Sequence, residues 1–392
     1  MKRGLDRLAV LGQRVFVRVD FNVPLKDGKV RDDTRIRAAL PTIDALRRGG
    51  ARVVLATHLG HPKGGPDPQL SLAPVAARLS ELLGAPVALA PDSVGPAAEA
   101  VVEGLANGAV ALLENTRFYP QEEQNDPAHA SRLAKLADLY VNDAFGAAHR
   151  AHASTEGIAR LLPSAAGLHM AAELSALERA LADPVRPFAA IIGGAKASDK
   201  IEVLKRLASL ADVLLIGGGM GNTFLHARGV NLQASLLEPD LVETARDVDE
   251  IAARAHCRVV LPVDGVVAAE ASAGAERRTV PVSEIPPGWR ILDVGPRTTA
   301  AYGEALQGVK TVLWNGPMGV YELAPFAEGT NRLARLLAES GAFVVVGGGD
   351  AVAAVQAAGV ADKMGHLSTG GGATLEFVEG KILPGVAVLP DA

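Results

Sequence analysis

The chain has 392 residues, of which 48% are hydrophobic and 21% charged, and this composition excludes a disordered chain and predicts two or three domains. The single cysteine, Cys257, excludes a disulfide framework and a cysteine-based zinc site. The formal net charge of −5 at pH 7 argues against a protein that binds nucleic acid.

Neither a transmembrane segment nor a signal peptide is expected. No apolar run approaches the roughly 18 residues that a membrane-spanning helix needs, and charges interrupt every apolar run near the N-terminus. We therefore expect a cytoplasmic protein without a membrane partner. The first 170 residues are more basic than the rest, which favours an anion-binding end, although chance variation of surface charge explains this equally well.

Short apolar runs alternate with Ala- and Leu-rich amphipathic stretches along the whole chain. Residues 15–19 predict a strand, residues 34–48 a helix that ends at Gly49, and residues 52–56 the next strand. Further strands are expected at 110–113, 139–141, 189–192, 213–216, 259–261, 312–314 and 343–346. This alternation indicates parallel sheets buried on both faces, and the number of strands favours two α/β domains. The best boundary lies near 161–164, before a helical connector over 170–182.

Ligands of open α/β sheets bind beyond the carboxyl ends of the strands, and in the first half these positions are rich in Arg and His. The polar residues there are Asp20, Asn22, Arg35, His58, His61, Arg117 and Arg150. Taken singly, each has an ordinary explanation such as an Asx turn, a helix cap or a surface ion pair. Together, the cations predict a basic pocket for a phosphate or carboxylate group. Metal binding by His58 and His61 is not favoured, because no third ligand lies nearby in the sequence.

Glycine-rich segments follow the strands of the second half. Gly193-Gly194 precedes Lys196 and Lys200, which would share one face of a helix that included both and would bind an anion at its N-terminus. Further glycine runs at 217–219, 347–349 and 370–372 favour a nucleotide site, although close strand–helix packing also selects glycine. Neither a dinucleotide-binding G-x-G-x-x-G nor a P-loop is present.

Three further residues complete this picture of the second half. Asp350 follows a glycine run and is suited to Mg²⁺. Glu322 and Pro317 are placed to contact a ribose and a base, although their segment taken alone predicts only a turn. A basic pocket in one lobe and a nucleotide site in the other fit phosphoryl transfer, because that reaction needs positioning and charge stabilisation more than covalent chemistry. The two lobes would have to close to align the reactants and exclude water.

Ten strings of residues make the sequence resemble the phosphoglycerate kinase family. They are RVDFNVP (18–24), THLGHPKG (57–64), LLENTRF (112–118), VNDAFGAAHRAHAS (141–154), GGAKASDKI (193–201), GGGMGNTF (217–224), DVGPRT (293–298), WNGPMGVYE (314–322), GGGD (347–350) and HLSTGGGATLE (366–376). They occur in the family's order and run from the first expected strand to near the C-terminus, so this signal is far more specific than any single motif.

The resemblance implies two doubly wound parallel-sheet, Rossmann-like α/β domains joined by a helix and hinge, with a C-terminal tail that returns to the N-terminal domain. The implied organisation is a phosphoglycerate-binding domain at 1–165, a connecting helix at 166–183, a nucleotide-binding domain at 184–380 and the tail at 381–392. A monomer is implied as well.

The resemblance further implies a glycolytic phosphotransferase with a carboxyl group as acceptor. Its reaction would be reversible in-line phosphoryl transfer from 1,3-bisphosphoglycerate to MgADP after hinge closure, giving 3-phosphoglycerate and ATP. By carry-over, phosphoglycerate would be bound by Asp20, Phe21, Asn22, Arg35, His58, Leu59, Gly60, His61, Arg117 and Arg150. The nucleotide would be bound by Lys196, Lys200, Gly217, Gly218, Leu292, Pro317, Glu322, Gly348, Gly349, Asp350 and Ala351, with Asp350 also holding Mg²⁺. Arg35, Lys196 and Gly371 would act on the transferring phosphoryl group.

The sequence departs from the family pattern at two of these positions. His61 stands where the family usually has Arg, and Ala351 stands where it usually has a hydroxyl residue. We predict that protonation of His61 tightens phosphoglycerate binding below about pH 6.5. The hydrogen bond lost at Ala351 is expected to leave activity intact, because backbone amides remain.

Two other functions stay open at this point. A catalytically weak homologue that binds a metabolite or a protein is one, and the intact Arg35, Lys196, Lys200 and Asp350 argue against it. An NAD-dependent dehydrogenase on a similar fold is the other, and the missing G-x-G-x-x-G disfavours it.

Overall fold

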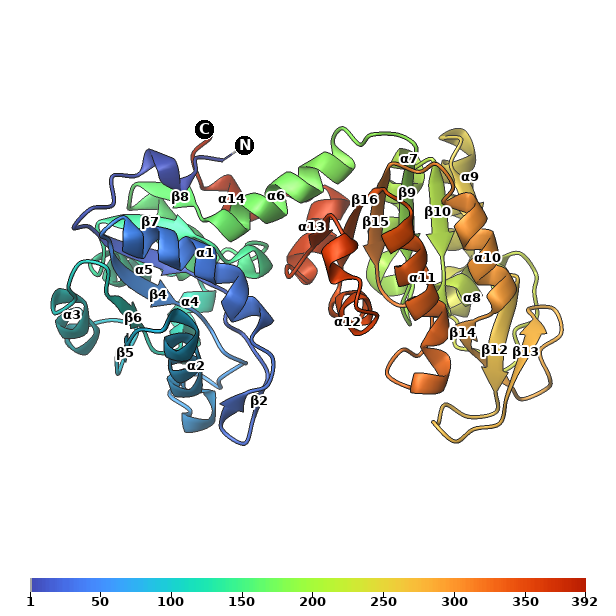
Figure 1. The fold of residues 1–392 in the computed structure, drawn as a ribbon, viewed down its shortest axis with the longest axis horizontal. Coiled ribbons are helices and arrows are strands. Elements are labelled where there is room, and N and C mark those ends of the chain that lie inside the picture. The colour runs from blue at the N-terminus through green and yellow to red at the C-terminus, as the bar shows by residue number, and fades with distance from the viewer. Residues whose placement is uncertain (1) are drawn as a thin grey trace. The chain divides into compact units, whose positions relative to one another are not determined.

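The computed structural model describes residues 2–392, which form two compact units (Figure 1). The first unit holds the residues up to Ser175 together with Ile382–Ala392, and the second holds Ala176–Lys381. The division falls within α6 (Leu168–Leu181), which is the helical connector expected at 170–182.

The first unit is built on a six-stranded parallel sheet with the strand order β5-β6-β4-β1-β7-β8. The strands are β1 (Arg14–Arg18), β4 (Arg52–Ala56), β5 (Val87–Leu89), β6 (Val110–Leu112), β7 (Leu139–Asn142) and β8 (Ser164–Ala166). The central strands are almost wholly buried, because helices cover both faces of the sheet.

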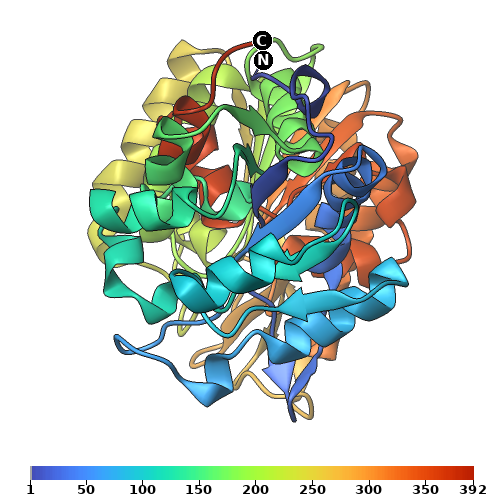
Figure 2. The ribbon, with the colours of Figure 1, turned by 90° about the vertical axis from the view of Figure 1, so that its left-hand side faces the viewer.

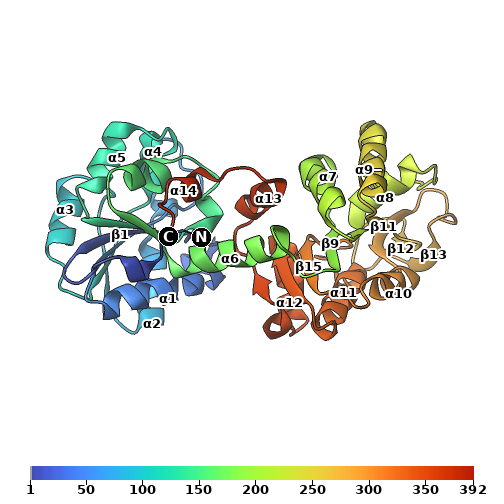
Figure 3. The same ribbon diagram turned by 90° about the horizontal axis from the view of Figure 1, so that it is seen from above.

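Figure 3 shows α1 (Thr34–Arg48) and α2 (Ala73–Leu83) on one face of this sheet, and α4 (Pro120–Glu123) and α5 (Pro127–Ala134) on the other. α3 (Pro96–Glu103) follows β5. α1 spans the residues expected from the sequence, and it buries Ile36, Ile43 and Leu46, which recur at helical spacing. A small hairpin of β2 (Leu25–Lys26) and β3 (Lys29–Val30) turns at Asp27-Gly28, where both residues have positive φ.

The C-terminal segment packs on the first unit, as expected. The Arg3 N–H donates to the Pro390 carbonyl at 2.8 Å, and Lys2 Nζ lies 2.9 Å from the Asp391 carboxylate. Figure 2 shows the two chain ends side by side. The tail contains α14 (Pro384–Ala387), and the side chains of Leu383 and Leu389 are buried.

The second unit is built on a six-stranded parallel sheet with the order β11-β10-β9-β15-β16-β17. The strands are β9 (Phe188–Ile192), β10 (Val213–Ile216), β11 (Arg258–Val260), β15 (Thr311–Asn315), β16 (Phe343–Gly347) and β17 (His366–Leu367). Counted along the chain, these strands follow the 3-2-1-4-5-6 order of the Rossmann fold. The topological switch point therefore lies between β9 and β15.

Helices cover both faces of the second sheet as well (Figure 3). One face carries α7 (Ile201–Leu210), α8 (Gly218–Ala227) and α9 (Val242–Arg254), and the other carries α10 (Pro296–Ala305), α11 (Glu328–Glu339) and α12 (Gly349–Ala357). α13 (Gly372–Glu379) packs against α7. A separate antiparallel sheet has the order β13-β12-β14, with β12 (Asp264–Ala268), β13 (Arg277–Pro281) and β14 (Arg290–Val294).

The predicted fold class of two parallel-sheet α/β units is confirmed, and all the strands expected from the sequence are present. The sequence did not predict β5, β8 and β17, which have only two or three residues, or the antiparallel sheet. β13 is mainly exposed and rich in Arg, so it lacks the apolar pattern of a core strand. Within residues 2–392, no helix is both long enough and apolar enough to cross a membrane.

We predict that Leu389→Ala lowers the free energy of unfolding by about 3 kcal/mol, because a fully buried leucine is replaced by a cavity. Leu389 is 1% exposed, whereas Ile382 in the same tail is 81% exposed. Ile382→Ala is therefore the matched control, and it should change the stability by less than about 0.5 kcal/mol. Calorimetric unfolding of the full chain measures both variants, and equal effects would contradict the packing of the tail described above.

Candidate functional site

The carboxyl ends of β1 and β4 bring four of the predicted residues of the first unit together. Arg35, from the first turn of α1, lies 2.9 Å from the Asp20 carboxylate. The Asn22 side chain accepts the Gly60 N–H at 3.0 Å. These contacts join the loop after β1 to the loop after β4, so both are held at one end of the sheet.

Arg117 and His61 lie beside these loops. Arg117 Nη1 donates to the Gly60 carbonyl at 2.9 Å and lies 3.3 Å from His61 Nδ1, while its Nε lies 3.0 Å from the Glu123 carboxylate. The Arg117 side chain is almost wholly buried, and burial lowers the pKa of its guanidinium.

Buried positive charge is the main electrostatic property of this end of the sheet. Burial, and then the charge of Arg18, hold the pKa of His58 well below its usual range. Burial and the neighbouring arginines likewise lower the pKa of His152 to about 3. The charges of Arg117 and Arg150 add to both shifts, which shows that Arg150 lies within electrostatic reach of this group. The cations of this group are therefore Arg18, Arg117 and Arg150, which lie close enough together to disfavour further positive charge, and such a group is suited to bind an anion.

Two predicted residues can contribute only backbone groups to a ligand. Phe21 is fully buried in the hydrophobic core, and its N–H donates to the Thr57 hydroxyl at 2.9 Å. Leu59 is also a core residue, and Asn115 bonds both its N–H and its carbonyl. The side chains of Phe21 and Leu59 hold the loops in place beneath the polar residues.

A buried polar network that the sequence did not predict lies beneath the basic cluster. Arg18 is 1% exposed, its Nε donates to the Ser154 hydroxyl at 2.8 Å, and its Nη2 lies 3.1 Å from His58 Nδ1. Ser154 in turn bonds the fully buried Glu122 carboxylate through its hydroxyl and its N–H. Burial raises the pKa of Glu122, and the Arg18 charge opposes that shift. The signal available in the sequence was an arginine within an otherwise apolar central strand.

In the second unit, Lys200 lies at the topological switch point. Its Nζ donates to the Gly193 carbonyl at 3.0 Å and to Asn315 Oδ1 at 2.5 Å, so it joins the loops after β9 and β15. Burial lowers the pKa of Lys200 to about 8, while the carboxylates of Asp199 and Asp350 act in the opposite direction. Lys200 is a half-buried ammonium at the place where α/β folds of this topology bind their ligands.

Lys196 and Lys200 were expected to share one helix face only if the helix included both, and this condition is not met. α7 begins at Ile201, after a short 3₁₀ turn over Ser198–Lys200, so neither lysine lies within it. Lys196 is exposed on the preceding loop. The Glu238 carboxylate holds that loop by accepting the N–H groups of Ala197 and Ser198, a contact that the sequence did not indicate.

Some glycines of the glycine-rich loops allow the loops to pack closely against one another, and others leave space for a ligand. A side chain at Gly193 would collide with the Pro317 carbonyl, and one at Gly218, where φ is +65°, would collide with Gly194. A side chain at Gly217 would meet Met318. These glycines are needed for close packing of the loops, whereas the Cβ positions of Gly349 and Gly371 face open space.

The N-terminus of α12 is the clearest anion-binding element of the second unit. Gly348, at φ +87°, precedes the helix, and the first-turn N–H groups of Gly349, Asp350 and Ala351 have no acceptor within the helix. Ala351 is fully buried in the core, which leaves its N–H as its polar group. Asp350 is exposed, and Gly371 precedes α13 at φ +54°.

The residues predicted for the base and the ribose lie on separate loops. Leu292 on β14 is buried beside Phe326, Pro317 is half-buried in the loop after β15, and Glu322 is exposed. Nearby, the buried Asp293 carboxylate accepts the N–H groups of Val294 and Gly329, and burial raises its pKa to about 7. Asp293 thus ties β14 to the start of α11.

Asp350 is suited to a metal ion for which the protein supplies only one of the coordinating groups. Among residues 2–392, no group of three or more His, Cys, Asp or Glu side chains could form a metal site of its own. A single exposed carboxylate beside the open Gly349 is the donor that Mg²⁺ uses when nucleotide phosphates and water supply its other ligands.

Comparisons with known proteins show the family of this chain. The family model described as phosphoglycerate kinase matches residues 5–381. Phosphoglycerate kinase of Roseiflexus sp. (strain RS-1) is 58% identical over 383 residues, covering 97% of both chains, and that of Moorella thermoacetica is 56% identical over 390 residues, covering 100% of this chain and 99% of its own.

Solved structures give the same result. The phosphoglycerate kinase structure from Coxiella burnetii superposes with a TM-score of 0.89 at 40% identity, covering 99% of this chain and 98% of its own. The structure from Pyrococcus horikoshii OT3 gives a TM-score of 0.86 at 36% identity with the same coverage. On the match of nearly its whole length in sequence and in fold, this chain belongs to the phosphoglycerate kinase family.

Proposed function

We propose that this protein catalyses the reversible transfer of a phosphoryl group from 1,3-bisphosphoglycerate to MgADP, which gives 3-phosphoglycerate and ATP in glycolysis. As a member of its family, the chain is a phosphotransferase with a carboxyl group as acceptor. The observation that carries the proposal is the positive charge of Arg18, Arg117 and Arg150 at the strand ends of the first unit, which favours binding of a small anion.

The phosphoglycerate lies in the basic cluster in this proposal. Arg35, Arg117 and Arg150 bind its phosphate and carboxylate groups, because guanidinium groups match the geometry of both. His58 and His61 add ring N–H donors, Asp20 and Asn22 bind the hydroxyl group, and Phe21, Leu59 and Gly60 line the site with backbone atoms. The contact between Asp20 and Arg35 keeps Arg35 oriented before the substrate arrives.

The nucleotide lies across the glycine-rich loops of the second unit. Lys200 and the N–H groups of Gly348, Gly349, Asp350 and Ala351 bind its phosphates. Leu292, Pro317 and the loop at Gly217-Gly218 frame the base, and Glu322 accepts a ribose hydroxyl. Asp350 holds Mg²⁺, which when bound shields the charge of the nucleotide phosphates.

The phosphoryl group is contacted during its transfer by Arg35, Lys196 and Gly371. The transition state spreads negative charge over three equatorial oxygens, and a guanidinium, an ammonium and a backbone N–H each stabilise that charge. Transfer in line requires the acyl phosphate and ADP to meet with water excluded. We therefore include hinge closure of the two units in the proposal.

The proposal places the enzyme in the cytoplasm as a monomer. A single chain supplies every residue assigned above, so the chemistry does not require a second copy. Both substrates are small, diffusible anions, which supports a location in the cytoplasm.

The first test is a coupled assay of ATP formation from 1,3-bisphosphoglycerate and MgADP. We expect activity in the wild type and a fall in kcat of roughly 10²–10³-fold in Arg35→Ala, because one donor to the transition state is lost. The control is Arg37→Ala on the same helix, where the side chain is 54% exposed and pairs with Asp33. If the wild type forms no ATP, the chain is a binding protein and the proposal is wrong.

We expect ADP binding to weaken above pH 8, because Lys200 loses its charge as the pH rises through its pKa of about 8. The sign follows from linkage: a bound anion favours the protonated lysine, so raising the pH opposes binding. Between pH 7 and pH 9 the Kd for ADP should rise by about tenfold.

Lys200→Arg keeps its charge over this range, so its Kd should stay nearly constant with pH. Lys205→Arg, on the adjacent helix α7, is the control and should keep the wild-type profile. Isothermal titration with ADP measures all three proteins. A Lys200→Arg profile as steep as that of the wild type would show that Lys200 does not bind the phosphates.

His61→Arg should bind 3-phosphoglycerate more tightly than the wild type at pH 7.5, because a guanidinium group presents a fork of several donors to an anion, whereas an imidazole ring presents at most two. Isothermal titration of both proteins with 3-phosphoglycerate measures the two dissociation constants. Equal dissociation constants would remove His61 from the anion site.

A further inference from the structure

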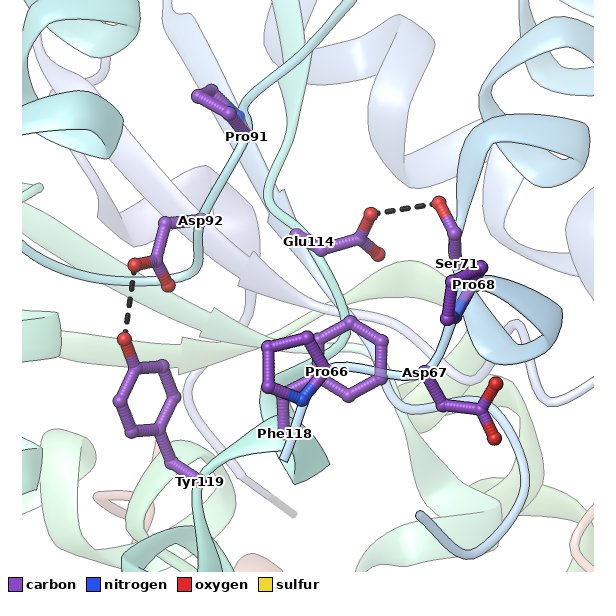
Figure 4. Close-up of a pocket in the computed structure, with 9 residues that line it drawn as sticks. All are labelled: Pro66, Asp67, Pro68, Ser71, Pro91, Asp92, Glu114, Phe118 and Tyr119. Carbon is purple, nitrogen blue, oxygen red and sulfur yellow. Dashed lines mark hydrogen bonds between the residues drawn. The ribbon is translucent and has the colours of Figure 1, made fainter. Parts of the chain in front are cut away.

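A cavity of the first unit lies outside the residues assigned to the phosphoglycerate. It has a volume of about 310 Å³, which is at the lower end of the range for small-molecule sites. Its lining comes from three loops: Pro66, Asp67, Pro68 and Ser71 after β4, Pro91 and Asp92 after β5, and Glu114, Phe118 and Tyr119 after β6 (Figure 4).

The walls of this cavity combine apolar surface with negative charge. Three prolines and the half-buried ring of Phe118 supply carbon surface, while Asp67, Asp92 and Glu114 supply carboxylates. In the described part of the chain, no Lys or Arg forms an ion pair with any of these three carboxylates. Arg132 lies beside the wall, with its guanidinium 5.4 Å from the centre of the Tyr119 ring.

The carboxylates are fixed in place by donors that leave their charge uncompensated. Asp92 accepts the Tyr119 hydroxyl at 2.9 Å, and Glu114 accepts the Ser71 hydroxyl at 2.8 Å, as Figure 4 shows. Glu114 also accepts the Leu72 N–H, and Asp67 accepts the Gln69 N–H. Neutral donors orient these groups without cancelling their negative charge, so an ammonium ion with a compact apolar body complements the cavity.

Two segments connect this cavity to the phosphoglycerate residues. The loop that begins at Gly60 and His61 continues to Pro66–Pro68 in the cavity wall. Arg117, which bonds the Gly60 carbonyl, immediately precedes Phe118 and Tyr119. A ligand that packs against Pro66 and Phe118 therefore orders the same two segments that carry His61 and Arg117.

We propose that this cavity binds a small organic ammonium ion with an apolar body, and that its occupation tightens phosphoglycerate binding. The coupling rests on the proposed function, whereas the binding of the ammonium ion does not. The direction of the coupling follows from charge and order: the ligand brings positive charge toward an anion site and restricts the two segments that form it.

The test of the site is isothermal titration of the full-length protein with 2-phenylethylammonium. For a ligand of this size we expect a Kd on the order of 1 mM. The neutral 2-phenylethanol and the anionic 3-phenylpropanoate should bind at least about fivefold more weakly, since they lack the charge that the carboxylates select. Equal binding of the three compounds, or no binding of the ammonium ion at about 10 mM, would overturn the proposal.

The variant that locates the site is Asp92→Asn, which removes one negative charge and keeps an oxygen that accepts the Tyr119 hydroxyl. It should weaken ammonium binding by about fivefold. Glu103→Gln, an exposed residue of α3 outside the cavity, is the matched control for charge and should bind as the wild type does. If the two variants weaken binding equally, the ammonium ion is attracted only by the net charge of the protein, and the assignment of its site to this cavity is wrong.

The test of the coupling is a titration of 3-phosphoglycerate with and without saturating 2-phenylethylammonium. The affinity should rise by about fivefold in the wild type, and by the same factor phosphoglycerate should tighten ammonium binding, because coupling is reciprocal. An unchanged affinity overturns the coupling. If 3-phosphoglycerate fails to bind under both conditions, the proposed function is wrong, and the ammonium titration alone still decides the cavity.

Discussion

The first unit depends on one electrostatic constraint, which is that positive charge buried at the end of a sheet must be compensated. Arg18 lies within a central strand at 1% exposure, and the Glu122 carboxylate reaches it through Ser154. Burial raises the pKa of the Glu122 carboxyl, and the charge of Arg18 opposes that shift. Arg117 pairs with the half-exposed Glu123, so its charge is the one that the proposed anionic substrate would compensate further.

The second unit depends on a steric constraint instead. Its loops approach one another so closely that Gly193, Gly217 and Gly218 admit no side chain. The same closeness lets a single lysine, Lys200, bond both the Gly193 carbonyl and Asn315. The packed glycines fix the positions of the loops. Gly349 and Gly371 instead leave open space at the N-termini of α12 and α13, so the same region combines close packing with room for a ligand.

Much of the fold was predictable from the sequence, because buried parallel strands are long apolar runs and α1 has a regular apolar face. The polar residues at the strand ends were predictable too, since the fold class places ligands there. The network of Arg18, Ser154 and Glu122 was not, because its members lie far apart in the chain and only the fold brings them together. The conformation around Lys196 was missed because the glycine-rich segment delays the start of α7 to Ile201.

In the proposed function the two units bind anions with different groups, and the shape of each ligand accounts for the difference. A phosphoglycerate has anionic groups at both ends of a short carbon chain, so several separate guanidinium and imidazole groups suit it. A nucleotide presents a row of phosphates behind a flat base, so aligned N–H groups at a helix N-terminus and glycine loops that admit close approach suit it better. The proposal therefore accounts both for the Arg- and His-rich sequence of the first unit and for the glycine runs of the second, part of which close packing of the loops also requires.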